Sequence, residues 1–287
     1  MTLKEFKFKF TEVLNPLYPK TEIDSFFFLL IDEYLKLERI DFSLNPNKEI
    51  DKENLKKLDD ALVRLEKEEP LQYIVGKTEF FGLPFIVNKT TLIPRPETEE
   101  LVEWIISEIE NNKELSNKNL SILDIGTGSG CIIISLAKSL KDNNYSAIDI
   151  SHQALKVAKK NAFYNNVKID FLESNILKTK KLTKTYDIII SNPPYVRDLE
   201  KSEIQNNVLE NEPHKALFVS DENPLIFYDK IADLAKKHLS KNGLLFFEIN
   251  QYLSQETLKL IECKSFNNIE LRKDLFGNYR MLKATNN

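Results

Sequence analysis

The sequence predicts an α/β protein in which a mostly parallel, doubly wound sheet follows a small helical bundle. Unbroken apolar runs such as ILDI, YDIII and LLFFEI alternate with helical patterns after residue 96, which is typical of parallel strands covered on both faces. A glycine-rich loop directly follows the first of these runs. No glycine precedes Gly76, and apolar residues recur in that region at three- and four-residue intervals, which indicates helices.

The N-terminal helical pattern falls into three segments, at residues 3–17, 23–37 and 51–68. Asp51 followed by Asn54 is a helix start signal, and Pro70 marks a stop. The aromatic run Phe26-Phe27-Phe28 is expected in the core of the bundle, with an exposed patch for a protein partner as the alternative. These segments together predict a helical domain over residues 1–70.

Residues 71–95 differ in character from the helical region before them. Short β-rich pieces are separated by Gly76, Gly82 and Asn88, which favours a β-hairpin linker rather than a further domain.

Strands and helices then alternate from residue 96 to residue 287, which is expected to be one domain. Strands are predicted at 121–125, 145–150, 168–172, 186–191 and 243–249, and helices at 97–109, 131–140, 153–165, 225–238 and 254–261. The stretch 268–283 is strand-like around a turn at Phe276-Gly277-Asn278. It is expected to form an antiparallel pair at the edge of the sheet.

The composition of the 287-residue chain limits the classes of partner. Its 40 basic and 44 acidic side chains leave a net charge of −4, whereas proteins that bind nucleic acid usually carry a basic domain or stripe. No direct nucleic-acid contact is therefore expected. The sequence shows no signal peptide or membrane-spanning run, no metal-binding cluster, and two distant cysteines typical of free thiols in a reducing compartment. We expect a cytoplasmic monomer without a bound metal.

A glycine-rich segment supplies the first candidate binding site. Its residues follow the strand at 121–125 and open a helix, so they lie where doubly wound sheets bind ligands: Gly126, Thr127, Gly128, Ser129 and Gly130. The spacing is G-x-G-x-G rather than the dinucleotide pattern G-x-G-x-x-G, because Cys131 occupies the position of the third glycine. Structural turn glycines are the alternative interpretation.

Asp149 ends the next predicted strand, one βαβ step later. An acidic side chain at this point accepts hydrogen bonds from the hydroxyls of a ribose. Capping of the following helix by Asp149 or Ser151 is the competing interpretation, and both roles are compatible. The loop and the acid together favour an adenosine cofactor, but they do not distinguish NAD from S-adenosylmethionine.

The segment Asn192-Pro193-Pro194-Tyr195 indicates the chemistry. It follows the strand at 186–191 and therefore lies at the same edge of the sheet as the glycine loop. Two prolines remove two backbone donors and leave carbonyls that only accept, and Asn192 adds a side-chain acceptor. We call this set of neutral acceptors the acceptor cup, and it suits an NH₂ group, which has two hydrogens to donate. Held by the Asn192 oxygen and the Pro193 carbonyl, with Tyr195 as an aromatic wall, a weakly nucleophilic nitrogen faces a methyl donor. Asn192, Pro193 and Tyr195 are thus the expected catalytic residues, and a rigid turn is the alternative.

At this point the chain resembles the bacterial release-factor glutamine methyltransferases, the PrmC/HemK family, over nearly its whole length. The segments that carry the resemblance are Glu69-Pro70-Leu71-Gln72-Tyr73-Ile74, Ile93-Pro94-Arg95-Pro96-Glu97-Thr98-Glu99, the glycine segment, Asp149-Ile150-Ser151, Asn192-Pro193-Pro194-Tyr195 and Glu212-Pro213 with Ala216-Leu217. The string I-P-R-P-E-T-E is far more specific than the cofactor motifs, which many methyltransferases share.

The resemblance implies a class I, Rossmann-like methyltransferase domain with a seven-stranded sheet. It implies methyl transfer from S-adenosylmethionine, with S-adenosylhomocysteine as product, to the side-chain amide nitrogen (N5) of the glutamine in the Gly-Gly-Gln motif of class-one peptide chain release factors. The helical domain would dock the release factor. By similarity, the glycine segment and Asp149 contact the cofactor, Asn192 to Tyr195 hold the glutamine, and Asn192 also lies against the cofactor.

Three sites depart from the family pattern or leave a role open. Asn175 and Ile176 stand where relatives often have aspartate and an aromatic residue beside the adenine. Asn175 still offers an oxygen to the adenine amine, and Ile176 offers apolar contact. Asn250 replaces the glycine of the usual Glu-Ile-Gly. Arg95 and Glu97 form either an ion pair that braces the linker or a contact to the cofactor.

Two other functions compete with glutamine methylation. An adenine-N6 methyltransferase acting on DNA or RNA would use the same acceptor cup, but it calls for a basic groove that the acidic composition does not favour. A non-catalytic binding module that retains the fold is the second alternative, and the intact acceptor segment argues against it.

Overall fold

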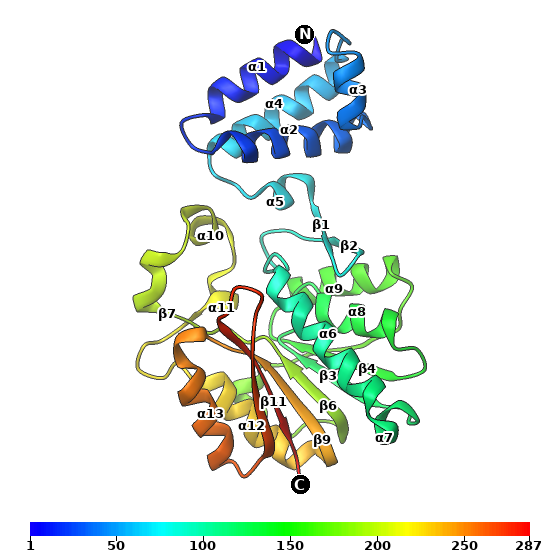
Figure 1. The fold of residues 1–287 in the computed structure, drawn as a ribbon, viewed down its shortest axis with the longest axis vertical. Coiled ribbons are helices and arrows are strands. Elements are labelled where there is room, and N and C mark those ends of the chain that lie inside the picture. Colours follow the sequence, from blue (N-terminus) through cyan, green and yellow to red (C-terminus); the bar gives the residue numbers. More distant parts are fainter. The chain divides into compact units, whose positions relative to one another are not determined.

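The computed structural model describes residues 1–287, which form two compact units. The first unit consists of Met1–Gly76 with Gln205–Asn211, and the second of Lys77–Ile204 with Glu212–Asn287. Figure 1 shows the helices of Met1–Gly76 in blue and cyan, and the sheet of the second unit between its helices. None of the helices combines the length and the apolar character needed to cross a membrane.

The first unit is a helical bundle, and the three predicted helices are confirmed. Its helices are α1 (Leu3–Leu14), α2 (Lys20–Leu35), α3 (Arg39–Leu44), α4 (Lys52–Glu66), α5 (Leu71–Val75) and α10 (Asn206–Asn211). The predicted start signal of α4 is also confirmed, because the Asp51 side chain accepts a hydrogen bond from the Asn54 backbone N–H. The short helices α3, α5 and α10 were not predicted.

An aromatic cluster forms the centre of this bundle. Phe27 is fully buried and its ring lies 6.4 Å from Phe6, 5.9 Å from Phe10 and 5.4 Å from both Phe28 and Phe42, measured between centroids. Rings at these separations gain both apolar burial and edge-to-face attraction. The expected core position is confirmed for Phe27, while Phe26 and Phe28 are partly buried and pack against the core.

The boundary between the units differs from the prediction of a linker over residues 71–95. Residues Leu71–Val75 form a helix of the first unit, and the second unit begins at Lys77. Leu71 and Ile74 are three residues apart, so one helical turn places both against the bundle core. Gly76 then ends the turn with φ +75°, a conformation that favours glycine. The predicted hairpin is present but shorter, as β1 (Lys77–Phe80) paired antiparallel with β2 (Leu83–Ile86).

The second unit contains the predicted seven-stranded sheet, in the order β10-β11-β9-β6-β3-β4-β5. Its strands are β3 (Ser121–Ile125), β4 (Asn144–Asp149), β5 (Asp170–Glu173), β6 (Tyr186–Ser191), β9 (Leu239–Glu248), β10 (Asn267–Lys273) and β11 (Tyr279–Thr285). The five strands β3, β4, β5, β6 and β9 run parallel, and β11 pairs antiparallel with both β9 and β10. The predicted antiparallel edge pair is therefore confirmed.

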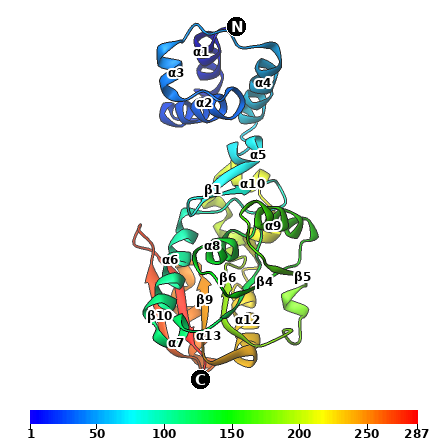
Figure 2. The same ribbon diagram turned by 90° about the vertical axis from the view of Figure 1, so that its right-hand side faces the viewer.

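Helices cover both faces of this sheet (Figures 1 and 2). Alternate strand residues such as Ile122 and Leu123 enter two separate cores. The first core includes side chains of α6 (Pro96–Asn111), α8 (Cys131–Ser139) and α9 (His152–Tyr164), and the second those of α12 (Ile226–His238) and α13 (Ser254–Cys263). Burial on both faces explains why the central strands β3, β6 and β9 contain continuous apolar runs.

Residues 192–224 lie between the predicted strand 186–191 and the predicted helix 225–238, and they hold several short elements that were not predicted. These are β7 (Val196–Arg197) and β8 (Phe218–Val219), which pair in parallel, a 3-10 segment at Asp198–Glu203, and the helices α10 and α11 (His214–Leu217). Elements of two to six residues are too short to show a periodic apolar pattern.

The aromatic cluster yields a stability prediction. Phe27→Ala should lower the free energy of unfolding of the helical unit by about 3–5 kcal/mol, because it removes a fully buried ring and leaves a cavity. Phe8→Ala is the matched control, since Phe8 lies on α1 with 66% of its surface exposed, and its effect should stay within about 0.5 kcal/mol. Chemical denaturation of the full chain measures both, and equal losses would contradict the assigned core.

Candidate active site

The predicted site residues meet at the carboxyl edge of the parallel strands. The register pairs Ile125 of β3 with Ile148 of β4 and with Ser191 of β6, so all three strands end at one level. The strand order reverses beside β3, which is the switch point where doubly wound sheets bind ligands. The glycine loop follows β3 and the Asn192–Tyr195 loop follows β6.

Backbone hydrogen bonds fix the glycine loop against β4. The N–H groups of Gly126 and Thr127 both donate to the Ile148 carbonyl, at 2.8 and 3.1 Å. Gly128 has φ +56°, and a side chain built there would meet no atom within 4 Å, so the loop is open on that side. At Gly130, by contrast, a Cβ would lie 2.8 Å from Ile134 Cδ1 and 3.3 Å from Ala158 Cβ. Gly130 therefore has a packing role between α8 and α9.

Asp124 lies beneath the loop with one unsatisfied oxygen. Its side chain is completely buried, and Oδ2 accepts a hydrogen bond of 2.6 Å from the Thr127 hydroxyl, whereas Oδ1 has no partner. Burial raises the pKa of Asp124 to about 7. A buried acceptor without a donor is unusual, and it suits a site that receives a donor from a ligand.

Asp149 occupies the end of β4 as predicted, and it also shapes the loop. Oδ2 accepts a hydrogen bond of 2.8 Å from the Gly128 N–H, and Oδ1 accepts one of 2.8 Å from the Ser151 N–H. Burial raises the pKa of Asp149, while these two backbone donors lower it. The helix α9 is capped by Ser151, whose Oγ accepts from the Ala154 N–H. Each Asp149 oxygen keeps a lone pair for a further donor.

Asn161 is a residue of this region that the sequence analysis missed. It is fully buried on α9, and its Nδ2 donates to the carbonyls of Ser129 and Ile86 at 2.9 and 3.0 Å. Its Oδ1 accepts from the Ile86 N–H at 2.7 Å. One amide thus connects the glycine loop to the hairpin strand β2. No short motif signals this role, because the partners lie 32 and 75 residues away.

The Asn175 and Ile176 pair lies after β5, next to the end of β4. The Asn175 oxygen accepts a hydrogen bond of 3.0 Å from the Leu177 N–H and so caps a short 3-10 helix. Ile176 is 9% exposed and belongs to the core that contains Leu123 and Ile148. Asn175 thus caps a helix and Ile176 packs in the core. Contact of either residue with a cofactor stays a prediction.

The loop after β6 lies directly beside the glycine loop. The Ser191 hydroxyl donates to the Ile125 carbonyl at 2.7 Å, and a Cβ built on Gly126 would lie 3.9 Å from the Asn192 carbonyl oxygen. Within the loop, neither the Asn192 side-chain oxygen nor the Pro193 carbonyl oxygen accepts a hydrogen bond from the protein. Two neutral acceptors are thus available next to the glycine segment.

A buried carboxylate at the end of β9 connects the loop to helix α6. Glu248 is 1% exposed, and its Oε2 accepts a hydrogen bond of 2.6 Å from the Thr98 hydroxyl, while Oε1 accepts one of 3.0 Å from the Tyr195 hydroxyl. Asn192 Nδ2 in turn donates to Thr98 Oγ1 at 3.4 Å. Burial raises the pKa of Glu248, and the two hydroxyls and the Arg280 guanidinium favour its charged form.

Asn250, at the position where the family pattern has glycine, braces the other end of the loop. Its Nδ2 donates to the Tyr195 carbonyl at 2.9 Å and to the buried Glu200 carboxylate at 2.9 Å, and its Oδ1 accepts from the Tyr252 N–H. Glu200 also pairs with Arg197 at 2.5 Å. The departure from the family pattern therefore has a structural role.

The suggested ion pair of Arg95 with Glu97 is not formed. Arg95 Nη2 pairs instead with Glu212 Oε1 at 2.5 Å, and Glu212 Oε2 accepts from the Ile93 N–H at 3.2 Å. Both partners belong to segments that the family resemblance singled out, but they are 117 residues apart. The sequence did not reveal this pairing because the contact is made only in the folded chain.

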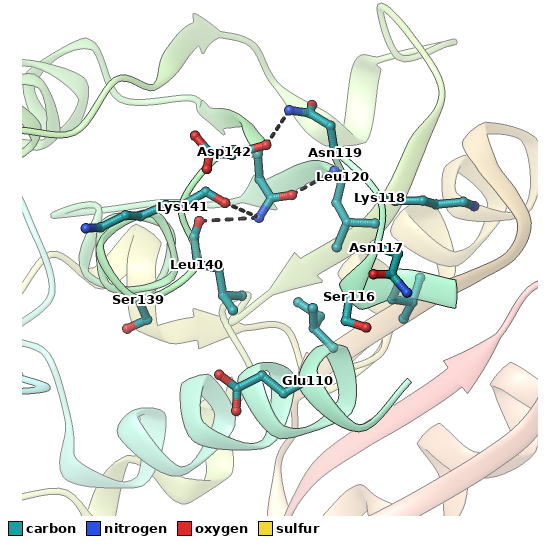
Figure 3. A pocket seen from close by; sticks show the side chains of 13 residues that line it. Glu110, Ser116, Asn117, Lys118, Asn119, Leu120, Ser139, Leu140, Lys141 and Asp142 are labelled. Atoms are coloured by element: carbon teal, nitrogen blue, oxygen red, sulfur yellow. Dashed lines mark hydrogen bonds between the residues drawn. The ribbon is translucent and has the colours of Figure 1, made fainter. Parts of the chain in front are cut away.

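A hollow of about 460 Å³ lies elsewhere on the second unit (Figure 3). Its lining includes Leu120 and Asn143, which directly precede β3 and β4, so it lies at the amino ends of the strands. It contains none of the predicted site residues. Parallel sheets bind their ligands at the opposite edge, which favours the site at the carboxyl ends.

Comparisons with known proteins support one family over the whole chain. A family model described as PrmC N-terminal domain matches residues 18–76, and one described as Methyltransferase small domain matches residues 103–217. A release factor glutamine methyltransferase of Flavobacterium psychrophilum is 54% identical over 284 residues, or 99% of each chain. Another, of Bacteroides thetaiotaomicron, is 41% identical and covers 94% of this chain and 95% of its own.

Solved structures agree on the fold. The hMettl16 catalytic domain in complex with MAT2A 3'UTR hairpin 6 is similar with a TM-score of 0.55 at 17% identity, covering 81% of each chain. The Thermus thermophilus 16S rRNA N2 G1207 methyltransferase, in complex with AdoMet and guanosine, reaches 0.52 at 18% identity over 74% of this chain and 50% of its own. The predicted fold of a class I methyltransferase is confirmed.

The orphaned carboxyl of Asp124 yields a pH prediction for the cofactor-free protein. Native Asp124 keeps its proton up to about pH 7, whereas an unfolded aspartate loses it near about pH 4. Between these values the unfolded state binds fewer protons, so stability falls as pH rises. From pH 5 to 8 the melting temperature of the wild type should fall relative to that of Asp124→Asn. Asp170→Asn, an exposed change on β5, should track the wild type. Parallel pH curves for wild type and Asp124→Asn would contradict the prediction.

Proposed function

The chain belongs to the release factor glutamine methyltransferase family, and on this premise we propose how its residues carry out the reaction. It methylates a glutamine side chain of peptide chain release factors. Following the family resemblance, the target is the amide nitrogen (N5) of the glutamine in the Gly-Gly-Gln motif. The methyl donor is S-adenosylmethionine and the product S-adenosylhomocysteine.

One observation carries the proposed mechanism. The Asn192 side-chain oxygen and the Pro193 carbonyl oxygen accept no hydrogen bond from the protein, and they belong to the loop whose Asn192 carbonyl lies near Gly126. A primary amide has two N–H hydrogens, and each can donate to one of these oxygens. That arrangement holds the nitrogen in one orientation and leaves its π face toward the methyl donor. The same oxygens would stabilise the positive charge that develops on nitrogen as the N–C bond to the methyl group forms and the bond from that methyl group to the sulfonium breaks. A proton then leaves the methylated nitrogen to solvent.

Tyr195 acts in this proposal through its ring and not as a base. Its hydroxyl donates to Glu248, and burial raises the pKa of Tyr195 far above its usual value. The hydroxyl therefore stays protonated at neutral pH. A strong base is not required, because the nitrogen becomes acidic only after it has gained the methyl group.

The residues at the glycine loop fit S-adenosylmethionine. The unpartnered Asp124 Oδ1 is a buried carboxyl oxygen, and the ammonium group of the amino-acid part would pair with it and favour its ionised form, while the open loop at Gly128 leaves room for a ligand. Asp149 retains a lone pair on each oxygen for ribose hydroxyls. When bound, the cofactor supplies an electrophilic methyl group on a sulfonium. The chain's own contribution is to bind it and to orient the acceptor nitrogen.

We further propose that the helical unit docks the release factor, as the family resemblance implies. The match of residues 18–76 to the PrmC N-terminal domain model supports this assignment. A release factor as substrate also agrees with the cytoplasmic location expected from the sequence.

Mass spectrometry of a release factor incubated with the protein and S-adenosylmethionine tests the proposal. We expect a gain of one methyl group on the glutamine of the Gly-Gly-Gln peptide. A parallel incubation with DNA and RNA serves as the control for the adenine-methylating alternative. Methylated adenine with an unmodified release factor would overturn the proposed substrate.

Two substitutions separate the acceptor site from the cofactor site. Asn192→Ala should lower kcat about a hundredfold or more, the scale of losing one positioned contact in the transition state, and leave the Kd of S-adenosylmethionine nearly unchanged. Asp149→Ala should weaken cofactor binding instead. Single-turnover kinetics and calorimetry measure these effects. Near-normal turnover by Asn192→Ala would exclude the acceptor role of its amide.

A further inference from the structure

We propose that Thr98 and Glu248 are positioning residues that determine which end of the Asn192 amide faces the substrate. The proposal rests on the function above, in which the Asn192 oxygen accepts a hydrogen from the glutamine amide. The amide group of asparagine can be turned over with almost no change in shape. The two orientations differ only in that its oxygen and its NH₂ group exchange places. One presents an acceptor to the substrate, and the other presents a donor that would oppose the NH₂ of glutamine.

Glu248, as a carboxylate, can only accept hydrogen bonds. Its two oxygens are engaged by the Thr98 hydroxyl at 2.6 Å and by the Tyr195 hydroxyl at 3.0 Å. Each hydroxyl has a single hydrogen, and each must direct it to the carboxylate. Thr98 is 2% exposed and Glu248 is 1% exposed, so bulk water does not compete for these bonds.

Thr98 Oγ1 is left with lone pairs only. The atom that faces it from Asn192, at 3.4 Å, must therefore be the NH₂ nitrogen, because two acceptors in contact would repel each other. The Asn192 oxygen then faces away from Thr98 and remains unpaired within the protein. The orientation required for glutamine follows from the chain Glu248, Thr98, Asn192.

The backbone holds Glu248 itself in place. The Tyr228 hydroxyl donates to the Glu248 backbone carbonyl at 3.1 Å, and Glu248 pairs with Met281 in the antiparallel ladder of β9 and β11. The carboxylate is thus a fixed reference on the sheet. Thr98 is equally fixed, because it lies in the first turn of α6 and its backbone N–H donates to the Arg95 carbonyl.

Paired substitutions at Thr98 test the proposal. Thr98→Val keeps the shape and removes the hydroxyl, so the Asn192 amide loses its guide, and kcat should fall about tenfold or more. The Kd of S-adenosylmethionine should change less than about threefold, and Thr98→Ser should restore kcat to within about threefold of the wild type. Thr257→Val is the matched control: Thr257 is also fully buried, but its hydroxyl donates to the Leu253 carbonyl, away from the site. It should keep the wild-type kcat.

A double-mutant cycle tests the direction of the hydrogen bonds. If Thr98 and Glu248 had a merely structural role, the two changes in the cycle would act on turnover independently. In Glu248→Gln, the new NH₂ group faces Thr98 and donates to its hydroxyl, which then directs its own hydrogen to residue 192. The Asn192 amide therefore turns its oxygen toward Thr98 and its NH₂ toward the substrate. Asn192→Asp presents an oxygen on both sides, so it suits this reversed chain but opposes the lone pairs of Thr98 in the wild type. We expect the double variant to turn over at least about threefold faster than the product of the two single effects predicts.

The outcomes separate this proposal from the function on which it rests. If Asn192→Ala abolishes glutamine methylation but Thr98→Val does not change kcat, or if the two changes in the cycle act independently, the positioning role is wrong and the function stands. If the wild type does not methylate the release factor, the proposed function itself fails. Melting temperatures of all variants confirm that each is folded before rates are compared.

Discussion

Parallel pairing of β3 with both of its neighbours is the constraint on which the site depends. Parallel strands present their carboxyl ends at one edge, and the register of Ile125 with Ile148 and Ser191 brings those ends to the same level. Segments that are tens of residues apart in the chain therefore become adjacent. The Asn192 carbonyl oxygen, for example, lies 3.9 Å from the position that a Cβ would take on Gly126. A slip of one residue in either pairing would reverse every side chain between the two cores, so burial protects the geometry of the site.

Two buried carboxylates near this edge differ in how far the protein satisfies them. Glu248 accepts hydroxyl hydrogens on both oxygens, and it therefore belongs to the framework. Asp124 accepts on one oxygen only, and its raised pKa expresses the cost of holding the other in an apolar setting without a donor. A buried carboxylate that served only the fold would lower the stability of the protein if one of its oxygens had no donor. A ligand donor would remove the defect, which supports our proposal that Asp124 belongs to the cofactor site, whereas Glu248 is hydrogen-bonded to the loop proposed to orient the substrate.

The central strands of the sheet were predictable from the sequence, since β3, β6 and β9 are largely buried on both faces and carry continuous apolar runs, whereas the edge strands β5 and β10 are largely exposed. Strands Ser121–Ile125 and Tyr186–Ser191 were predicted to the residue, and the motifs that follow them do lie at one edge. The helix Leu71–Val75 was mistaken for part of a hairpin, because five residues with two β-branched side chains resemble a strand until Gly76 is known to end a turn. The partners of Asn161, Arg95 and Glu248 could not be predicted. Their hydrogen bonds join residues 32 to 150 positions apart, and no local pattern encodes such pairs.

Asn250 shows how a departure from a family pattern becomes bound to other positions. Its single amide satisfies both the Tyr195 carbonyl and the Glu200 carboxylate, tasks that the glycine of the family pattern cannot perform. A relative with glycine at this position must satisfy the same two groups with water, or carry a different residue in place of Glu200. Positions 200 and 250 are therefore expected to vary together among related chains. Introducing either residue alone into a related chain would lower the stability of that chain. Substitutions at the two positions are therefore expected to have arisen in pairs.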